Sequence, residues 1–574
     1  MKKARPRKPI KLTEFLEQAQ ADKGQFEAGQ DLGEDSGQES GQGAGEESAR
    51  KEAQPPATPL IGILDIDLSE VKKRLGAKNS DVVYREFVAG GCDGVPMAVV
   101  FIDGMVDKTA INDGILKTLL VDVHKIPPEA REGKRDPHQW IKSALLAIGE
   151  VKDVSTIDEV IDAVLAGDAP ILVDGMTEAI VTGVKGWPTR SISEPDTEAI
   201  VRGPREGFTE TLRVNTALIR HRLKSPDLRV DPFKVGERTK TDVALLYIKG
   251  LADERLIREA KSRITAIKVD GILDAGYLEQ YIEDQPFSPF PQIGNTERPD
   301  RVVGFLLEGR LAIIVDGSPF ALVIPSEMNT FMQSPEDYYD RPYTVLFLRV
   351  IRAIASIGAL LLPSLYVAVT TFHPELLPTP LALSIAAGRE GKPFPPFIEA
   401  LLMEFVFETL REAGVRLPRP FGQAVGIVGA IVIGQASVTA GLVSPLLLII
   451  VSLTAVATFA FPSFLMANSI RLVRFPLMLL AAVSGLYGIV WGLIFLTVHL
   501  MTLRSFGVPY FFPWAPTSRR AILSDTLIRA PLWSMRRRPD IVRPQDPIRQ
   551  KKGMKPGPRG KGGTGTHESG ESDE

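Results

Sequence analysis

Four apolar runs in the second half of the sequence set the strongest constraint on what this chain can fold into. The runs cover residues 345–372, 421–440, 443–466 and 475–503. A helix needs roughly 20 residues to cross about 30 Å of hydrocarbon, and each run reaches this length or comes close to it. The sequence therefore predicts an all-α, multi-span membrane domain over residues 336–516, in which four helices cross the bilayer.

The two ends of the chain have the composition of solvated tails. Residues 1–57 begin with lysines and arginines and continue as a Gly-, Gln- and Glu-rich acidic stretch with few groups to bury. Residues 517–574 are basic for most of their length, with far more Lys and Arg than Asp and Glu up to residue 561. We therefore expect a disordered N-terminal tail and a basic, largely disordered C-terminal tail.

Composition and motifs also exclude several classes of function. The net charge of −3 over 574 residues provides no global basic field, so no nucleic-acid partner is expected. The only cysteine, Cys92, excludes an intramolecular disulfide framework and any cysteine-based zinc site. The six histidines are scattered, and neither a Walker loop nor a G-x-S-x-G elbow is present. The sequence predicts a protein that is not an enzyme, with no catalytic, cofactor-binding or metal-binding residues.

An apolar run that ends in Asp-Gly occurs three times in the front half of the chain. The copies lie at residues 97–104, 169–175 and 311–317. Each run predicts a strand, and Asp-Gly accepts the positive φ angles of a tight hairpin turn. The pattern therefore predicts three β-hairpins. Three aspartates are then turn residues rather than catalytic carboxylates: Asp103, Asp174 and Asp316.

The second and third copies match over a longer stretch than the first. Gly167 precedes Gly175 by the same interval as Gly309 precedes Gly317, and helical segments alternate with the strands. This alternation favours layered α/β structure. We expect a cytosolic α/β region of two related subdomains in front of the membrane domain. Its parts are the first subdomain (58–195), a connector with a helix (196–240) and the second subdomain (241–335).

Two shorter segments of this region have patterns of their own. Residues 60–75 predict an opening helix that is capped by Asp67 or Ser69. Residues 284–292 are rich in Pro and Phe, which predicts an extended, rigidly packed loop, with a peptide ligand as the alternative.

Polar side chains surround the start of the first apolar run. We expect Arg349 and Arg352 to reach back to the cytoplasmic headgroups, and Tyr338, Tyr339 and Tyr343 to lie at interface depth.

Residues 397–412 predict an amphipathic helix with an acidic face. Glu404, Glu408 and Glu412 recur every fourth residue and share this face, while Arg411 stands three residues after Glu408 and can relieve part of the repulsion. One interpretation is an interfacial helix with a wet face. The other is a ring of carboxylates at the mouth of an oligomeric cation pore, which makes Glu404 and Glu408 candidate pore residues.

The second apolar run carries polar side chains near its end. They are compatible with a water path that has a narrow apolar point, and equally with hydrogen bonds between packed helices. The candidate ion-path residues of this segment are Gln435, Ser437, Val438 and Thr439.

The charge distribution predicts the topology. No apolar signal segment follows the basic start, so the front domain stays in the cytosol, and four spans return the chain to the same side. The basic residues of 517–561 place that side in the cytoplasm. Arg471 and Arg474, between the last two predicted spans, fit this topology poorly.

Six longer stretches in fixed order carry a family resemblance. They are GPREGFTE (203–210), TERPD (296–300), EGRLAIIVDGSPF (308–320), REAGVRLP (411–418), GQASV (434–438) and SFGVPY (505–510). The chain resembles the GerA spore germination protein family, the A subunits of spore germinant receptors. The resemblance runs from about residue 80 to residue 516 and leaves out only the tails.

The resemblance implies a multi-pass protein of the spore inner membrane. Its implied partners are a transporter-like B subunit that binds the nutrient, a C-subunit lipoprotein and the lipid bilayer. A subunits of this family are proposed to assemble as a homo-oligomer, a pentamer, into a nutrient-gated channel. Such a channel releases monovalent cations early in germination.

Three functions are open at this point. The chain is a gated ion-conducting subunit, or a non-conducting membrane signalling scaffold, or a member of the family branch associated with the dipicolinate-channel locus. That branch amplifies germination without a nutrient-binding partner. A secondary transporter is not favoured, because the sequence shows neither inverted repeats of spans nor a buried charged pair at mid-bilayer.

Overall fold

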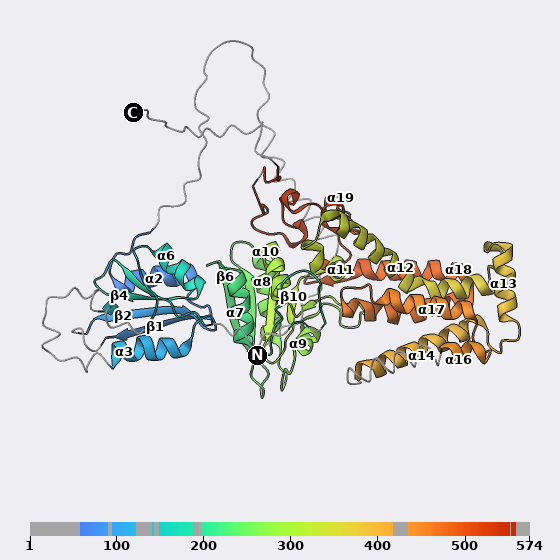
Figure 1. The fold of residues 1–574 in the computed structure, drawn as a ribbon, viewed down its shortest axis with the longest axis horizontal. Helices are drawn as coiled ribbons and strands as arrows, with labels where there is room; N and C mark the ends of the chain where they lie inside the picture. The colour runs from blue at the N-terminus through green and yellow to red at the C-terminus, as the bar shows by residue number, and fades with distance from the viewer. Residues whose placement is uncertain are drawn as a thin grey trace, which may run out of the picture. The chain divides into compact units, whose positions relative to one another are not determined.

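The structure is a computed structural model (Figure 1). It describes residues 58–89, 94–121, 141–142, 148–186, 194–195, 197–416, 434–551 and 553–557. The chain forms two compact units, one over Met1–Ala77 with Val82–Trp187 and one over Lys78–Asp81 with Pro188–Glu574. The predicted N-terminal tail lies outside the described residues.

The first unit is built on a five-stranded antiparallel sheet with the order β1-β2-β4-β5-β3. Its strands are β1 (Val82–Val88), β2 (Pro96–Ile102), β3 (Val151–Val154), β4 (Ala169–Val173) and β5 (Ala179–Thr182). Its helices are α2 (Leu64–Leu75), a wide turn (Ala110–Leu116) that leads into α3 (Lys117–Leu120), and α6 (Ile157–Ala166). Every residue of β4 and β5 is buried, so this hairpin forms the centre of the core.

The second unit begins with a sheet of equivalent order, β6-β7-β9-β10-β8, which is also antiparallel. Its strands are β6 (Leu228–Val235), β7 (Thr241–Ile248), β8 (Gly294–Thr296), β9 (Leu311–Val315) and β10 (Ala321–Ile324). Its helices are α7 (Leu212–Arg222), α8 (Glu254–Ala266), α9 (Ala275–Ile282) and α10 (Pro299–Glu308). Buried apolar clusters cover both faces of this sheet. The predicted α/β region thus contains two antiparallel sheets, and α7 and β6 of the second one come from the segment expected to be a connector.

The second and third Asp-Gly copies form the predicted hairpins, β4–β5 and β9–β10. Their aspartates also act alike: Asp174 accepts a hydrogen bond from the first amide of α2, Leu64, and Asp316 accepts one from the first amide of α7, Leu212. Each turn aspartate thus pairs with a backbone N–H at the start of a helix, a group that has no partner within the helix itself. The prediction of a hairpin at Asp103 is wrong, because β2 pairs with β1 and β4 and the chain after Gly104 enters a helical turn.

The opening helix has a different cap from the predicted one. The residue before α2 is Ile63, which makes no side-chain cap, and Asp67 instead accepts hydrogen bonds from the amides of Ile61 and Gly62. The carboxylate therefore fixes the turn that precedes the helix.

One carboxyl group on helix α9, Glu279, gives a pH-dependent prediction. Burial, together with Glu283 and Asp274, raises the pKa of Glu279 from 4.5 to about 8. The folded state then binds this proton more tightly than the unfolded state. The stabilisation is therefore complete below about pH 4.5 and is lost as the pH rises to about 8. Glu279→Gln should flatten this decline in the melting temperature of the detergent-solubilised protein between pH 5 and 9. The same change at the exposed Glu237 should leave the decline in place.

A helical bundle follows the second sheet (Figure 1). It contains α12 (Pro342–Thr371), α13 (Thr379–Arg389), α14 (Pro396–Arg416), α16 (Gly434–Thr439), α17 (Pro445–Thr458) and α18 (Phe464–Thr502). Within the described ranges, α12 and α18 are long and apolar enough to cross a membrane. Most of the predicted span 421–440 lies outside the described residues. Short strands β11 (Arg504–Ser505) and β12 (Val508–Pro509) follow the bundle, and α11 (Met328–Met332) precedes it.

The last two predicted spans have different boundaries in the structure. The run 443–466 is divided, because α17 ends at Thr458 and α18 begins at Phe464. The run 475–503 is not one straight helix, because Gly485 takes a non-helical φ of 58° and the chain reverses there. A Cβ on Gly488 would lie 2.1 Å from the carbonyl oxygen of Leu480, although residues eight apart in a straight helix are about 12 Å apart. α18 is thus a hairpin of two arms, 464–484 and 486–502.

The close approach of these arms gives a stability prediction. Gly488→Ala puts a methyl group against the Leu480 backbone, which cannot move without opening the hairpin. We expect a loss of about 3 kcal/mol, visible as a lower melting temperature. Gly388→Ala in α13 is the matched control, because a Cβ there meets nothing within 4 Å. Equal melting temperatures for the two variants would contradict the hairpin geometry.

The structure describes residues 517–551 and 553–557 of the C-terminal segment and gives them defined turns and contacts, which differs from the prediction of a largely disordered tail for that part. It contains α19 (Arg519–Ala521) and further helical turns at Ile522–Thr526, Leu532–Ser534 and Asp540–Val542. Val542 is buried in the core of the second sheet, and the Gln545 side chain donates to the carbonyl of Ala252 at 3.0 Å. A few specific contacts therefore hold a segment whose composition is that of a solvated tail.

Candidate functional site in the helical bundle

The first residue on the acidic face of α14, Glu404, points into the bundle rather than toward water. The Glu404 carboxylate lies 2.6 Å from Nη1 of Arg474, and both side chains are 3% exposed. Arg474 also donates to the carbonyl of Ala359 at 2.8 Å and to Oγ1 of Thr458 at 3.2 Å. One guanidinium thus connects α18 with α14, α12 and α17.

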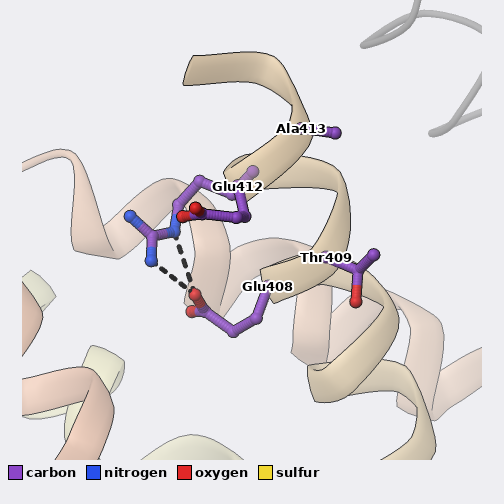
Figure 2. Close-up of a pocket in the computed structure, with 5 residues that line it drawn as sticks. Glu408, Thr409, Glu412 and Ala413 are labelled. Atoms are coloured by element: carbon purple, nitrogen blue, oxygen red, sulfur yellow. Dashed lines mark hydrogen bonds and ion pairs between the residues drawn. The ribbon is translucent and has the colours of Figure 1, made fainter. Parts of the chain in front are cut away.

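The second member of the acidic face lies closer to solvent. Glu408 pairs with Arg411 at 2.7 Å and with Arg471 at 3.5 Å. The predicted contact between Arg411 and Glu408 is therefore confirmed. Figure 2 shows Glu408 and Glu412 on one side of the helix and Thr409 on the other, around the hollow that these residues line.

These pairs correct three expectations. The bundle contains a buried charged pair, Glu404–Arg474, which the sequence did not indicate. Arg471 and Arg474 belong to the first arm of α18 rather than to a loop between spans. The wet-face interpretation is wrong for Glu404, which is 2% exposed. The signal available in the sequence is a match of spacing, because two carboxylates one turn apart face two arginines about one turn apart.

A further carboxylate, Glu399, lies inside the same bundle. Its side chain is fully buried, and its nearest cation is Arg389, at 3.7 Å. Tyr366 of α12 and Ser444, which precedes α17, form a hydrogen bond of 2.9 Å in the same bundle. α14 therefore presents three carboxylates to its neighbours, which is a dense polar content for helices that are otherwise apolar.

The other candidate residues lie on the short helix α16, and the structure does not bring them to Glu404. Gln435 and Thr439 are exposed and share a face, whereas Ser437 and Val438 are half-buried. Thr439 donates to the carbonyl of Gln435 at 2.8 Å, and Val438 packs against the apolar core of the bundle.

A second cluster of charges joins the first span to the segments outside the bundle. Asp337, which is 1% exposed, accepts hydrogen bonds from Arg349 at 3.0 Å and from Arg352 at 3.1 Å. Arg349 also pairs with Asp525 of the C-terminal segment at 3.2 Å. Snorkelling of these arginines to the headgroups is therefore not what the structure shows. We call Asp337, Arg349, Arg352 and Asp525 the junction cluster.

Neighbouring groups extend the junction cluster. Burial raises the pKa of Asp525, while Arg349 acts in the opposite direction. Tyr338 donates to Asp525 at 2.8 Å, and burial raises the pKa of this hydroxyl well above its usual range, so it stays a donor. Tyr339 donates to Asp300 near the start of α10, and only Tyr343 of the three predicted interface tyrosines is largely exposed, at 87%.

The start of β9 is fixed by a buried bidentate pair. Arg310 contacts the two carboxylate oxygens of Glu327 at 2.7 and 2.8 Å. Arginine and carboxylate match in this geometry, which makes the contact directional as well as strong. It ties the β9–β10 sheet to the chain just before α11. Within the described ranges, no three His, Cys, Asp or Glu side chains converge as a metal site requires.

Fold and site together define a class: a membrane protein whose helical bundle is cross-linked by arginine–carboxylate pairs and joined to an α/β region with two antiparallel sheets. The sequence matches the family described as Bacillus/Clostridium GerA spore germination protein over residues 69–541. The chain therefore belongs to the GerA family, the A subunits of spore germinant receptors. Membership of this non-enzymatic family confirms that the chain is not an enzyme.

Similar proteins cover most of the chain. Spore germination protein KA of Bacillus subtilis (strain 168) is 47% identical over 494 residues, which are 86% of this chain and 89% of that protein. Spore germination protein GerLA of Bacillus cereus is 40% identical over 83% of this chain and 95% of its own length. A crystal structure of the N-terminal domain of the A subunit of the Bacillus megaterium spore germinant receptor GerK3 is 35% identical. It covers 47% of this chain and 97% of that domain, with a TM-score of 0.37.

Proposed function

We propose that this chain is the ion-conducting subunit of a nutrient-gated spore germinant receptor. Several copies, five in the proposed assembly, surround a path for monovalent cations that opens when germination begins. The observation that carries the proposal is the arrangement of α14 and α16. The carboxylates of α14 turn inward to arginines, whereas Gln435 and Thr439 of α16 stay exposed on one face of an apolar bundle. Uncharged polar side chains at a subunit boundary suit a path that passes ions without holding them.

The buried pairs give this path a means of control. Arg474 connects the helices of one subunit, and the junction cluster connects α12 to Asp337 and Asp525. A movement outside the bundle is therefore transmitted to α12 and, through Ala359 and Arg474, to α14. In this proposal Glu404 and Glu408 position helices rather than form a ring of ion ligands. Gln435 and Thr439 line the path, and the half-buried Ser437 and Val438 join this face to the bundle.

The proposal includes partners and location. A transporter-like B subunit binds the nutrient, a C-subunit lipoprotein completes the receptor, and the complex lies in the spore inner membrane. The ordered C-terminal segment packs on the second α/β sheet, which supports placing both on the cytoplasmic side.

Two alternatives have different expectations. A non-conducting scaffold would use the junction cluster only to relay a signal to partners. A member of the branch associated with the dipicolinate-channel locus would amplify germination without a nutrient-binding partner. Both predict that the reconstituted receptor releases no ions in response to nutrient.

Cation efflux from vesicles separates these functions. The purified chain is reconstituted in potassium-loaded liposomes, alone and with its B-type partner, and efflux is recorded before and after nutrient is added. Efflux that requires both partner and nutrient supports the conducting role. Silence from an assembled complex that still binds nutrient would support the scaffold. Efflux that needs neither nutrient nor the B-type partner would favour the amplifying branch.

A further inference from the structure

The Pro- and Phe-rich loop that follows α9 carries one phenylalanine whose side chain is entirely exposed. Phe287 is 100% exposed, although Phe290, three residues later, is only 3% exposed. Burial of a phenylalanine side chain lowers the free energy by roughly 1.5–3 kcal/mol. A phenylalanine that is fully exposed on an ordered loop would therefore be stabilised by an apolar environment that covers it.

The loop is rigid, so the exposure of Phe287 does not arise from a loosely held chain. Gln292 is 1% exposed, and its side chain closes the loop through two hydrogen bonds to the backbone of Gln285. Its oxygen accepts from the Gln285 amide at 2.9 Å, and its nitrogen donates to the Gln285 carbonyl at 2.7 Å. Prolines at 286, 289 and 291 fix further φ angles. A preorganised loop of this kind loses little entropy when its tip is inserted.

The loop is fastened to both arms of the α18 hairpin near their outer ends. Ser288 Oγ lies 3.0 Å from His499 Nε2 on the second arm, and Ser469 of the first arm donates to the Pro289 carbonyl. His499 is within one turn of Thr502, where α18 ends. The loop therefore lies at the end of the hairpin that is opposite its turn at Gly485.

The surface next to the loop has the character of a lipid-facing helix. Side chains on the second arm of α18 at this level are apolar and more than half exposed: Phe495, Val498 and Met501. The acidic residue at the base of the loop is already paired, because Asp284 contacts Arg263 at 2.5 Å and accepts from the Gly507 amide. No unpaired charge of Asp284 therefore opposes an approach to lipid.

We propose that residues 284–292 form a membrane-interface anchor, in which the closed loop inserts Phe287 at the boundary between headgroups and acyl chains. The occupant is the lipid bilayer, because the loop continues the exposed apolar surface of α18 at the end of its span. Aromatic side chains favour this depth. The anchor fixes the height of the second α/β sheet above the membrane.

A spin label measures the depth of this position. The only cysteine, Cys92, is replaced by serine, and the full chain with Phe287→Cys is labelled with a nitroxide and reconstituted in phosphatidylcholine–phosphatidylglycerol bilayers. Because the Phe287 side chain packs against nothing, the substitution leaves the fold intact. The control is Lys234→Cys on β6, at the opposite edge of the sheet, where the side chain is 69% exposed.

The expected result is a reversal between the two sites. At 287 the label collides more often with oxygen, which concentrates in hydrocarbon, than with a water-soluble nickel chelate, and at 234 the order is the opposite. Frequent nickel collisions at 287, as at 234, would overturn the anchor, since the loop would then lie in water. Exclusion of both reagents at 287 would also overturn it, and would indicate that protein, such as a second copy of this chain, covers the residue.

Discussion

Replacing Arg474 by glutamine is expected to destabilise the bundle by about 3–5 kcal/mol, because Glu404 is left as a buried charge without its partner. The same change removes the donors to Ala359 and Thr458, so α12, α14 and α17 lose their common contact. We expect a lower melting temperature of the solubilised protein and, in the reconstituted receptor, loss of control of efflux by nutrient.

A double variant distinguishes loss of the pair from loss of packing. Arg474→Gln with Glu404→Gln removes both charges, so it should recover most of the lost stability. Arg411→Gln, whose side chain is 33% exposed, is the matched control and should cost less than about 1 kcal/mol. The single variant Glu404→Gln is measured as well. If the losses of stability in Arg474→Gln and in Glu404→Gln simply add in the double variant, Glu404 and Arg474 do not act as a pair.

The second large effect is expected at the junction cluster. Asp337→Ala leaves Arg349 and Arg352 without their shared carboxylate in a buried site, and we expect a loss of about 3–5 kcal/mol. The loss is local: amide hydrogen exchange should accelerate over the first turns of α12 and around Asp525, while the strands of the second sheet stay protected.

The neighbouring Asp340 provides the control for this variant. Its side chain is 38% exposed and pairs with Arg202 at 3.4 Å, so Asp340→Ala should change exchange by little. Uniform acceleration of exchange over the sheet and the bundle in Asp337→Ala would show that the aspartate supports global stability rather than the junction.

Local patterns allowed much of this architecture to be predicted. The hairpins at Asp174 and Asp316 follow from turn chemistry and adjacent apolar strands, which are neighbours in the sequence. The membrane region follows from apolar runs of sufficient length. The same local pattern was misleading at Asp103, where the pairing of β2 with β1 and β4 decides the topology.

The site depends on contacts that no local pattern contains. Arg474 and Glu404 are 70 residues apart, and only the fold shows that they pair. The reversal at Gly485 lies in an unbroken apolar run, where hydropathy gives no signal. The C-terminal segment has the composition of a tail, yet Asp525, Val542 and Gln545 each contact a distant part of the chain.

Thiol modification on α16 tests most directly whether this chain lines the ion path. In the Cys92→Ser background, Thr439→Cys is reconstituted with the B-type partner, and nutrient-triggered potassium efflux is measured before and after a positively charged thiol reagent is added. Ile449→Cys, an apolar position on α17 with 63% exposure, is the control. Our proposal predicts that modification at 439 blocks efflux and that modification at 449 leaves it unchanged. Efflux that persists after complete modification at 439 would contradict the proposal and place the path outside this face of the subunit.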